Sequence, residues 1–243
     1  MKILLSEAIK YRVLTGSSCI EWLNRSLRPA NWLARFRTRS TIKWTLSNGG
    51  AVKVNIGCGR TRIDETWLHG DIHRGDIYVN AMKRFPFEDD SVDVIFSEQL
   101  IEHLPGKKIR KFWSECFRVL KPGGWMRHST PDLDFIVKLY HGEIHDVDLD
   151  MFYQRIRHIR KDTPHPCIYM NEILTLWGHR FIYDESYLRK VWMDSGFVNV
   201  KRVRYGLSDK PELAGLEQHS KTGWVQNGFT LIMEAQKPPE NRS

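Results

Sequence analysis

The chain has 243 residues, a net charge of +8 and an apolar fraction of 41%, which fit one globular domain with an appendage. Its four cysteines stand far apart without a C-x-x-C pair, which argues against a disulfide frame or a zinc site and for reduced thiols in the cytoplasm. The longest apolar run near the N-terminus, Ile3-Leu4-Leu5, is too short for a signal peptide or a membrane span.

The positive charge is concentrated at the N-terminus. The first 50 residues hold nine Lys or Arg and two acids, whereas the remaining 193 hold 28 basic and 27 acidic residues. Residues 1–46 therefore read as a basic helical extension, which could cap the core, lie on an anionic membrane surface or bind nucleic-acid phosphates. We expect residues 1–46 to cap the core of the domain. A cap of this kind is compatible with a peripheral position at the inner membrane face or with contact to a lipid-linked substrate. Nucleic acid is the least favoured partner, because the basic residues lie outside the remaining domain.

The stretch VKVNIGCGR, residues 52–60, organises the rest of the chain. Alternating apolar residues predict a short strand, and Gly57 and Gly59 around Cys58 predict a sharp turn that brings backbone close to a ligand. Open α/β sheets build cofactor sites on such turns. Asp71 follows Gly59 by only twelve residues, so the first crossover has room for a short turn or a stub of helix. A carboxylate at that strand end could bind both ribose hydroxyls.

The later segments continue an alternation of strands and helices. Strands are expected at 76–79, 92–96, 125–129, 198–203 and 229–235. A helix from Pro105 should stop at Pro122-Gly123-Gly124 with Lys121 in its last turn, and a second helix should start at Asp184 as N-cap. Residues 134–182, with helical patterning at 135–140, 151–159 and 171–177, read as an insertion that shapes a substrate pocket.

Several motifs together carry a family resemblance. VNIGCG, LHGDI, FPFEDDSVDVIFSEQLIEHL and FRVLKPGGWMRHSTPDL resemble the S-adenosylmethionine-dependent methyltransferases of the type 11 group. WGHRFIYDESYLRKVWMDSGF and PELAGLEQH resemble a branch associated with bacterial surface-polysaccharide biosynthesis. The resemblance implies an α/β fold over residues 47–243: a Rossmann-like, mostly parallel sheet with its last strand antiparallel and helices on both faces. It also implies S-adenosylmethionine as cofactor.

The same resemblance implies which residues contact the cofactor. They are the strand residue Asn55, the turn Gly57, Cys58 and Gly59, the pair Asp71 and Ile72 near ribose and adenine, Asn80 and Ala81 at the adenine edge, and the backbone of Ser97 and Glu98. Asn55 stands where the family often has an acid. An NAD fingerprint is excluded because Arg62 occupies the place of its third glycine.

Methyl transfer to a hydroxyl needs a base that removes a proton near neutral pH, which favours histidine. The candidates are His103 after the fourth strand, His128 in the fifth strand and His179 in the insertion. Related quinone-precursor methyltransferases bind a metal through acids in the Glu-His segment. Gln99 stands where one such acid is needed, so no metal is expected.

The expected function is methyl transfer to a sugar hydroxyl of a glycan or glycolipid precursor. Two alternatives stay open: methyl transfer to a small metabolite at oxygen or nitrogen, and a non-catalytic module of the same fold at a membrane.

Overall fold

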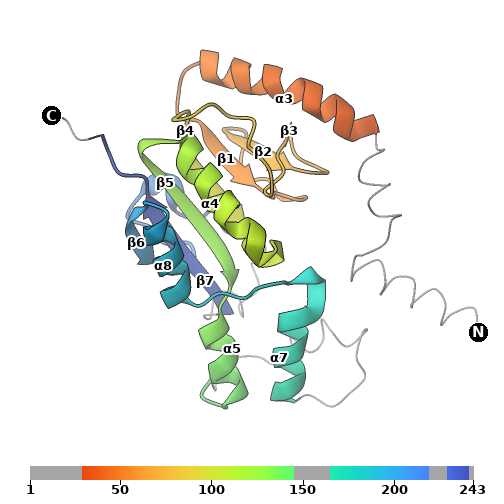
Figure 1. Cartoon of the computed structure of the whole chain (residues 1–243), viewed down its shortest axis with the longest axis vertical. Coiled ribbons are helices and arrows are strands. Elements are labelled where there is room, and N and C mark those ends of the chain that lie inside the picture. The colour runs from red at the N-terminus through yellow and green to blue at the C-terminus, as the bar shows by residue number, and fades with distance from the viewer. Residues whose placement is uncertain (1–28, 145–164, 219–228, 241–243) are drawn as a thin grey trace, which may run out of the picture.

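A seven-stranded sheet dominates the structure, a computed structural model that describes residues 29–144, 165–218 and 229–240 (Figure 1). The strands are β1 (Lys53–Ile56), β2 (Trp67–Asp71), β3 (Ile77–Tyr78), β4 (Val92–Glu98), β5 (Leu120–Pro131), β6 (Val198–Arg202) and β7 (Thr230–Gln236). Their order is β3-β2-β1-β4-β5-β7-β6, and β7 runs antiparallel to both of its neighbours, β5 and β6. The predicted Rossmann-like sheet with an antiparallel last strand is confirmed.

The connection between β1 and β2 contains turns and extended backbone only, so the predicted short crossover is confirmed. The parallel strands β2, β1, β4 and β5 end at one edge of the sheet. Residues that follow those ends therefore meet there, although they come from distant parts of the chain.

The fifth strand differs from the prediction at its start. The helix from Pro105 ends at Val119, and β5 begins at Leu120, so Lys121 lies in the strand and not in a helical turn. Its ammonium is 2.8 Å from the carboxylate of Asp93 on β4. The helix ends at Val119 because Leu120 already pairs with Val92 of β4. The prediction had placed the end of the helix later, at Pro122-Gly123-Gly124.

The helices are α3 (Pro29–Ser47), α4 (Gly106–Val119), α5 (Leu133–Tyr140), α7 (Pro166–Thr175) and α8 (Glu185–Asp194), with short 3-10 turns η1 (Ile101–His103), η2 (Leu176–Gly178) and η3 (Pro211–Leu213). Helices α4 and α8 pack on one face of the sheet and bury its main apolar core. Trp113 of α4 and Trp192 of α8 meet edge to face with centroids 5.3 Å apart. Asp184 caps α8 as predicted, because its carboxylate accepts from the amide of Tyr187 at 2.7 Å.

On the opposite face of the sheet, the described residues include a small apolar cluster beneath the loop after β6. Trp67, Phe96 and Trp125 form a small core with Leu213 and Leu216, which come from the loop after β6 and its short turn η3. The loop after β6 thus contributes apolar side chains to this face of the sheet.

Buried charges hold the loop in place. Arg127 of β5 is fully buried, and its guanidinium lies 2.6 Å from the carboxylates of both Glu217 and Glu234. It also donates to the carbonyl of Leu207 at 2.8 Å. Such a network is stable only with its partners in place, so it fixes the loop on the sheet.

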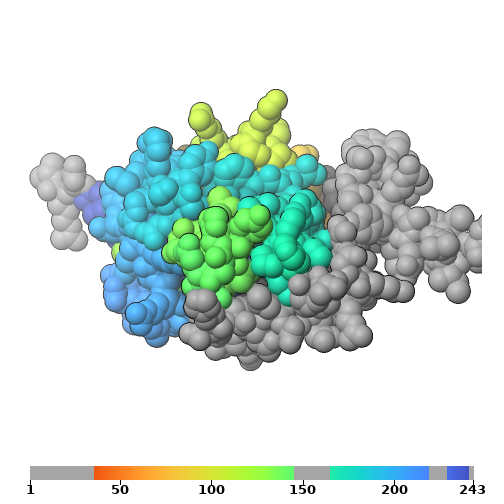
Figure 2. All heavy atoms as spheres, turned by 90° about the horizontal axis from the view of Figure 1, so that it is seen from below, coloured from red at the N-terminus to blue at the C-terminus, as the bar shows by residue number. Residues whose placement is uncertain are grey.

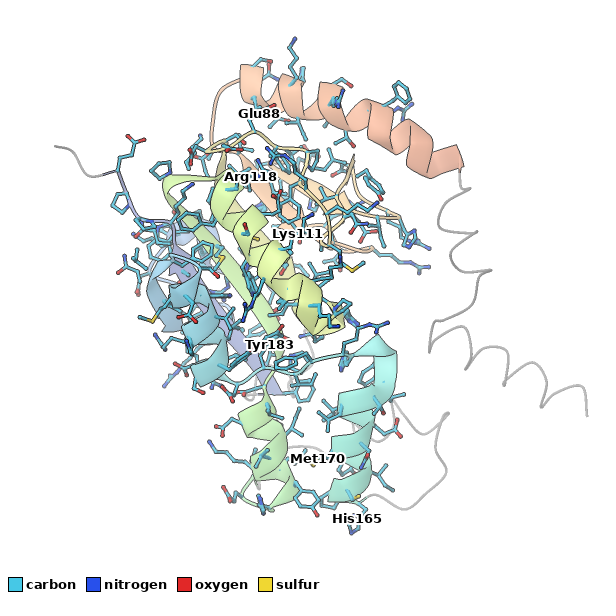
Figure 3. The ribbon with its side chains drawn as sticks, in the orientation of Figure 1. Glu88, Lys111, Arg118, His165, Met170 and Tyr183 are labelled. Carbon is cyan, nitrogen blue, oxygen red and sulfur yellow. The ribbon has the colours of Figure 1, made fainter. Side chains whose placement is uncertain are left out.

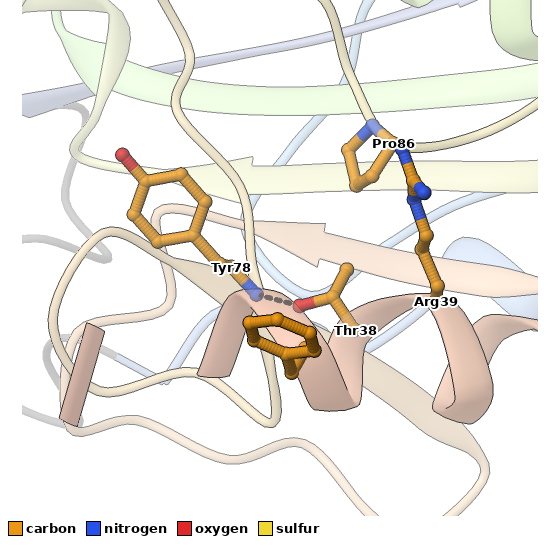
Figure 4. Close-up of a pocket in the computed structure, with 5 residues that line it drawn as sticks. Thr38, Arg39, Tyr78 and Pro86 are labelled. Atoms are coloured by element: carbon orange, nitrogen blue, oxygen red, sulfur yellow. Dashed lines mark hydrogen bonds between the residues drawn. The ribbon is translucent and has the colours of Figure 1, made fainter. Parts of the chain in front are cut away.

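Helix α3 lies along the free edge of the sheet. The hydroxyl of Thr38 accepts from the amide of Tyr78 on the edge strand β3 at 2.8 Å, which satisfies an edge donor. A hollow of about 330 Å³ lies between the helix and the edge, lined by Phe36, Thr38, Arg39, Tyr78 and Pro86 (Figure 4). None of the described helices has the length and apolar character to cross a bilayer.

The insertion forms a second, smaller core. Helices α5 and α7 lie side by side below the sheet (Figures 1 and 2) and share buried residues such as Phe135, Tyr169 and Ile173. The helix predicted at 151–159 lies outside the described residues.

Candidate active site

The two glycines of the turn after β1 have different surroundings: Gly57 lies against another side chain, and Gly59 borders open space. Gly57 has φ +74°, and a Cβ there would lie 2.7 Å from a methyl of Leu100. The positive φ favours glycine here, and any side chain would also have to displace the end of the Leu100 side chain. The sequence predicted that a ligand would require this glycine. Gly59 has φ +54°, and a Cβ there would meet no atom within 4 Å. The open space that suits a ligand lies at Gly59.

Asp71 borders that open space from the end of β2. One carboxylate oxygen accepts from the amide of Gly59 at 3.3 Å, and the other accepts from the amides of His73 at 2.6 Å and Arg74 at 3.1 Å. These bonds fix the carboxylate beside the turn, as recognition of a ribose diol requires. The pairing of an open cradle with a fixed carboxylate fits S-adenosylmethionine.

The predicted adenine residues follow β2 and β3. The side-chain oxygen of Asn80 accepts from the amide of Met82 at 2.9 Å, so the amide nitrogen remains as donor for a base edge. Ala81 is buried and Ile72 is half-buried.

The other two predicted positions in this part of the site are buried. Asn55 lies inside β1, and burial raises the pKa of the Cys58 thiol to about 11, which keeps it protonated.

Ser97 and Glu98 end β4, and their side chains face protein partners. The hydroxyl of Ser97 hydrogen-bonds the Nδ1 atom of His128, and the carboxylate of Glu98 accepts from the amide of Gln218 at 2.9 Å. Their predicted role concerned backbone groups and stays a prediction.

His128 lies in an aromatic environment on the inner face of β5. Its ring is fully buried and meets the edges or faces of Phe112, Trp113 and Trp192 at centroid distances of 5.1–5.7 Å. Burial lowers its pKa to about 3, so the ring is neutral at physiological pH. The structure does not bring His128 together with the other two predicted histidines.

His103 and His179 do meet, beside the carboxyl ends of β4 and β5. Their ring centroids are 5.0 Å apart, and the Nε2 atom of His103 is 4.0 Å from a carboxylate oxygen of Glu102. The amide of Arg180 donates to the backbone carbonyl of Glu102 at 2.7 Å, which ties the insertion to η1. Leu100, the residue against Gly57, begins the same turn, so the histidines adjoin the glycine turn.

The Glu102 carboxyl is fully buried, and burial raises its pKa to about 8. The hydroxyl of Thr130 donates to one oxygen at 3.1 Å, while the other has no hydrogen-bond partner among the described residues. A carboxyl in this environment is protonated at neutral pH.

His179 is held as a neutral ring. Its Nδ1 atom lies 2.5 Å from the carbonyl of Ile173, and since a carbonyl only accepts, we assign the proton to Nδ1. Burial lowers the pKa of His179 despite this bond. The Nε2 atom then carries a lone pair, as a general base needs.

Glu102, His103 and His179 are also the residues that could hold a metal ion, since one ligand atom from each lies within 4.8 Å of the others. Two imidazoles and a carboxylate suit a divalent transition ion. The expectation of no metal used the spacing around Gln99, and spacing could not show that His179 joins the cluster. Nothing in the structure decides that expectation, which stays a prediction.

Sequence reasoning missed three contributors to this region. Leu100 gives no sequence signal, since apolar residues are common there. Thr130 lies within the motif STPDL, but its contact with Glu102 needs the pairing of β4 with β5. Trp177 precedes Gly178, and this aromatic-glycine pair is a turn signal that could have been noticed.

The family model described as "Methyltransferase domain", of the type 11 methyltransferases, matches residues 54–127. A Mycolicibacterium smegmatis protein described as "Probable S-adenosylmethionine-dependent methyltransferase" is 48% identical over 59 residues, 24% of this chain and 22% of that protein. An uncharacterized Haemophilus influenzae protein is 49% identical over 45 residues, 18% of each. The chain thus spans about a fifth of the length of these relatives.

Solved structures show weaker similarity. A SAM-dependent methyltransferase from Archaeoglobus fulgidus aligns over 90% of this chain and all of its own, with 14% identity and a TM-score of 0.45. A Haloferax volcanii complex of the Trm112 activator with a methyltransferase aligns over 86% of this chain and 92% of the matched chain, with 16% identity and a TM-score of 0.44.

Proposed function

We propose that this chain, which carries an S-adenosylmethionine-dependent methyltransferase domain over residues 54–127, methylates a sugar hydroxyl of a glycan or glycolipid precursor. The observation that carries the catalytic part is the neutral His179 ring beside His103, next to the glycine turn. The sugar acceptor is supported by the C-terminal motifs, which resemble a polysaccharide-associated branch.

The cofactor supplies an electrophilic methyl group on a sulfonium when bound. Gly59 and Asp71 would hold it, because open space and a fixed carboxylate lie there together. A sugar hydroxyl keeps its proton at neutral pH and is a weak nucleophile, so a base must remove the proton as the oxygen–carbon bond forms. The Nε2 atom of His179 would accept that proton, and His103 would orient the hydroxyl.

Calorimetry with S-adenosylmethionine and S-adenosylhomocysteine tests the cofactor site. Both should bind the wild type, and Gly59→Val and Asp71→Asn should each weaken binding at least about tenfold, since one fills the open space and the other removes the charged acceptor. Gly142→Val is the matched control, because Gly142 has φ +71° and open space at the end of α5. Absence of binding to the wild type would contradict the proposal.

The acceptor is tested by mass spectrometry of surface glycans from cells with and without the protein. A methyl group should be missing without it, and His179→Asn should reproduce that loss while it leaves cofactor binding intact. Unchanged glycans with a methylated small metabolite would contradict the sugar acceptor.

We also propose that the N-terminal extension, residues 1–46, contacts an anionic membrane or a lipid-linked substrate. The described part of α3 supports this, since Phe36 and Trp44 are each 66% exposed and Arg37, Arg39 and Lys43 are exposed beside them. Cations interleaved with exposed aromatics suit the headgroup region of a bilayer.

A further inference from the structure

We propose that Trp177 is a stacking platform for the acceptor, and that the acceptor ring is a saccharide whose hydroxyl edge faces His179 and His103. This inference rests on the proposed methyl transfer and adds a specificity-determining residue to it. Trp177 opens the motif WGHRF, and the family resemblance assigns it no role.

The backbone of Trp177 is strained. It has φ 56° and ψ 9°, the left-handed region that bulky side chains rarely adopt, and Gly178 follows with φ +82°. Strain of this kind persists where surrounding contacts fix it, and it clusters at ligand sites. Here the amide of His179 donates to the carbonyl of Leu176 and closes the turn.

The side chain of Trp177 is half exposed. Trp177 is 47% exposed, whereas Leu176 before it is buried. The strained turn thus leaves part of a large aromatic ring in solvent beside His179. An aromatic face with this exposure suits binding of a ligand.

The turn places this ring at the catalytic cluster. The centroids of Trp177 and His179 are 5.7 Å apart, and those of His179 and His103 are 5.0 Å apart. A Cβ on Gly178 would lie 3.9 Å from the Nδ1 atom of His103, so the chain passes close to that ring. The indole of Trp177 thus borders the imidazole of His179, which in turn borders that of His103.

A pyranose matches this arrangement. Its axial C–H groups form an apolar face that is attracted by the electron-rich face of indole, and its hydroxyls project from the ring edge. Stacked on Trp177, such a ring would present a hydroxyl to the Nε2 atom of His179. An exposed platform also leaves the remainder of a longer glycan in water.

The first experiment uses fluorine NMR of the full chain labelled with 5-fluorotryptophan, with the Trp177 signal assigned by its loss in Trp177→Phe. Methyl glycosides of glucose, galactose, mannose and rhamnose are titrated to about 50 mM, above the millimolar Kd typical of weak ligands, with and without S-adenosylhomocysteine. At least one should shift the Trp177 signal selectively. No shift with any glycoside, or a shift with catechol alone, would overturn the proposal.

The second experiment separates binding from structure. Trp177→Gly removes the ring and the backbone strain, so we expect an unchanged or higher Tm, at least tenfold weaker glycoside binding and unchanged S-adenosylhomocysteine affinity. Asn199→Gly is the matched control, because Asn199 has φ 52° in β6, and it should leave glycoside binding unchanged. A lower Tm with unchanged glycoside binding would assign Trp177 a structural role and overturn the proposal.

The two proposals fail in different ways. If the wild type binds neither S-adenosylmethionine nor its product, the methyl-transfer proposal fails, and the titration without cofactor still decides whether Trp177 binds sugar. If the cofactor binds and the Trp177 signal does not shift with any glycoside, only the proposal that Trp177 stacks on the acceptor is overturned.

Discussion

Two buried titratable side chains near the site are neutral for the same reason. Burial without a counter-charge penalises the ionised form, which raises the pKa of Glu102 to about 8 and lowers that of His128 to about 3. Glu102 is therefore protonated and His128 unprotonated at pH 7. The histidine pair beside Glu102 follows Leu100, the residue that lies against Gly57.

These pKa values predict opposite pH slopes of stability. The folded state keeps the Glu102 proton that the unfolded state releases near pH 4.5, so this group destabilises the fold as the pH rises from 4.5 to 8, by about 1.4 kcal/mol per pH unit. His128 is charged only in the unfolded state between its unfolded pKa of 6.5 and about 3, so it destabilises the fold as the pH falls through that range.

Urea unfolding from pH 5 to 8 checks this in the Glu102→Gln variant. The free energy of unfolding should fall less steeply with rising pH than in the wild type, since the amide does not titrate. Parallel curves for the two proteins would show that Glu102 is ionised in the fold. Asp194→Asn, at an exposed carboxylate of α8, is the control.

The glycine turn gives a second prediction at this scale. Gly57→Ala should lower stability by about 1–3 kcal/mol, because its Cβ overlaps Leu100 and the residue keeps a positive φ. Gly57→Ala combined with Leu100→Ala should recover the steric part, relative to Leu100→Ala alone. Thermal unfolding of the double-mutant cycle measures this coupling, and purely additive effects would exclude the contact as the cause.

Among the elements, the loop after β6 packs on one face of the sheet through Leu213 and Leu216. Its attachment depends on Arg127, which is buried between Glu217 of the loop and Glu234 of β7. Buried ion pairs are weak sources of net stability, yet the loss of one partner leaves a charge in a low dielectric.

Glu217→Gln should therefore lower the free energy of unfolding by about 3 kcal/mol. Urea denaturation measures it. Lys190→Gln, which breaks the exposed pair with Asp194, is the matched control and should change stability by less than about 0.5 kcal/mol. Equal effects of the two substitutions would mean that the Arg127 network does not hold the loop.

At the scale of the whole molecule, charge and exposed aromatics coincide on α3 along the sheet edge, on the outside of the domain. Figure 3 shows Tyr183 between the sheet and the insertion, away from α3. Membrane binding through α3 would thus leave that end of the domain uncovered.

Cosedimentation with vesicles tests this arrangement. The full chain should bind phosphatidylglycerol vesicles at low salt and lose binding as ionic strength rises, and it should not bind phosphatidylcholine vesicles. Phe36→Ser with Trp44→Ser should weaken binding at least about fivefold, as each buried aromatic contributes apolar area. Exposed Met193→Ser on α8 is the control, and equal losses would contradict a role for α3.

The sequence by itself determined the succession of strands along the chain, the glycine turn, the carboxylate twelve residues later and the N-cap at Asp184, because each depends on neighbours along the chain. The sequence also predicted that the glycine turn and Asp71 meet at one edge of the sheet, since parallel strands end on the same side. Only the tertiary structure decided that Leu100 packs on Gly57, that β5 starts at Leu120 and that a loop covers the second face. Only it joined His179 and Trp177 to Glu102 and His103, because contacts across more than seventy residues depend on how the insertion docks.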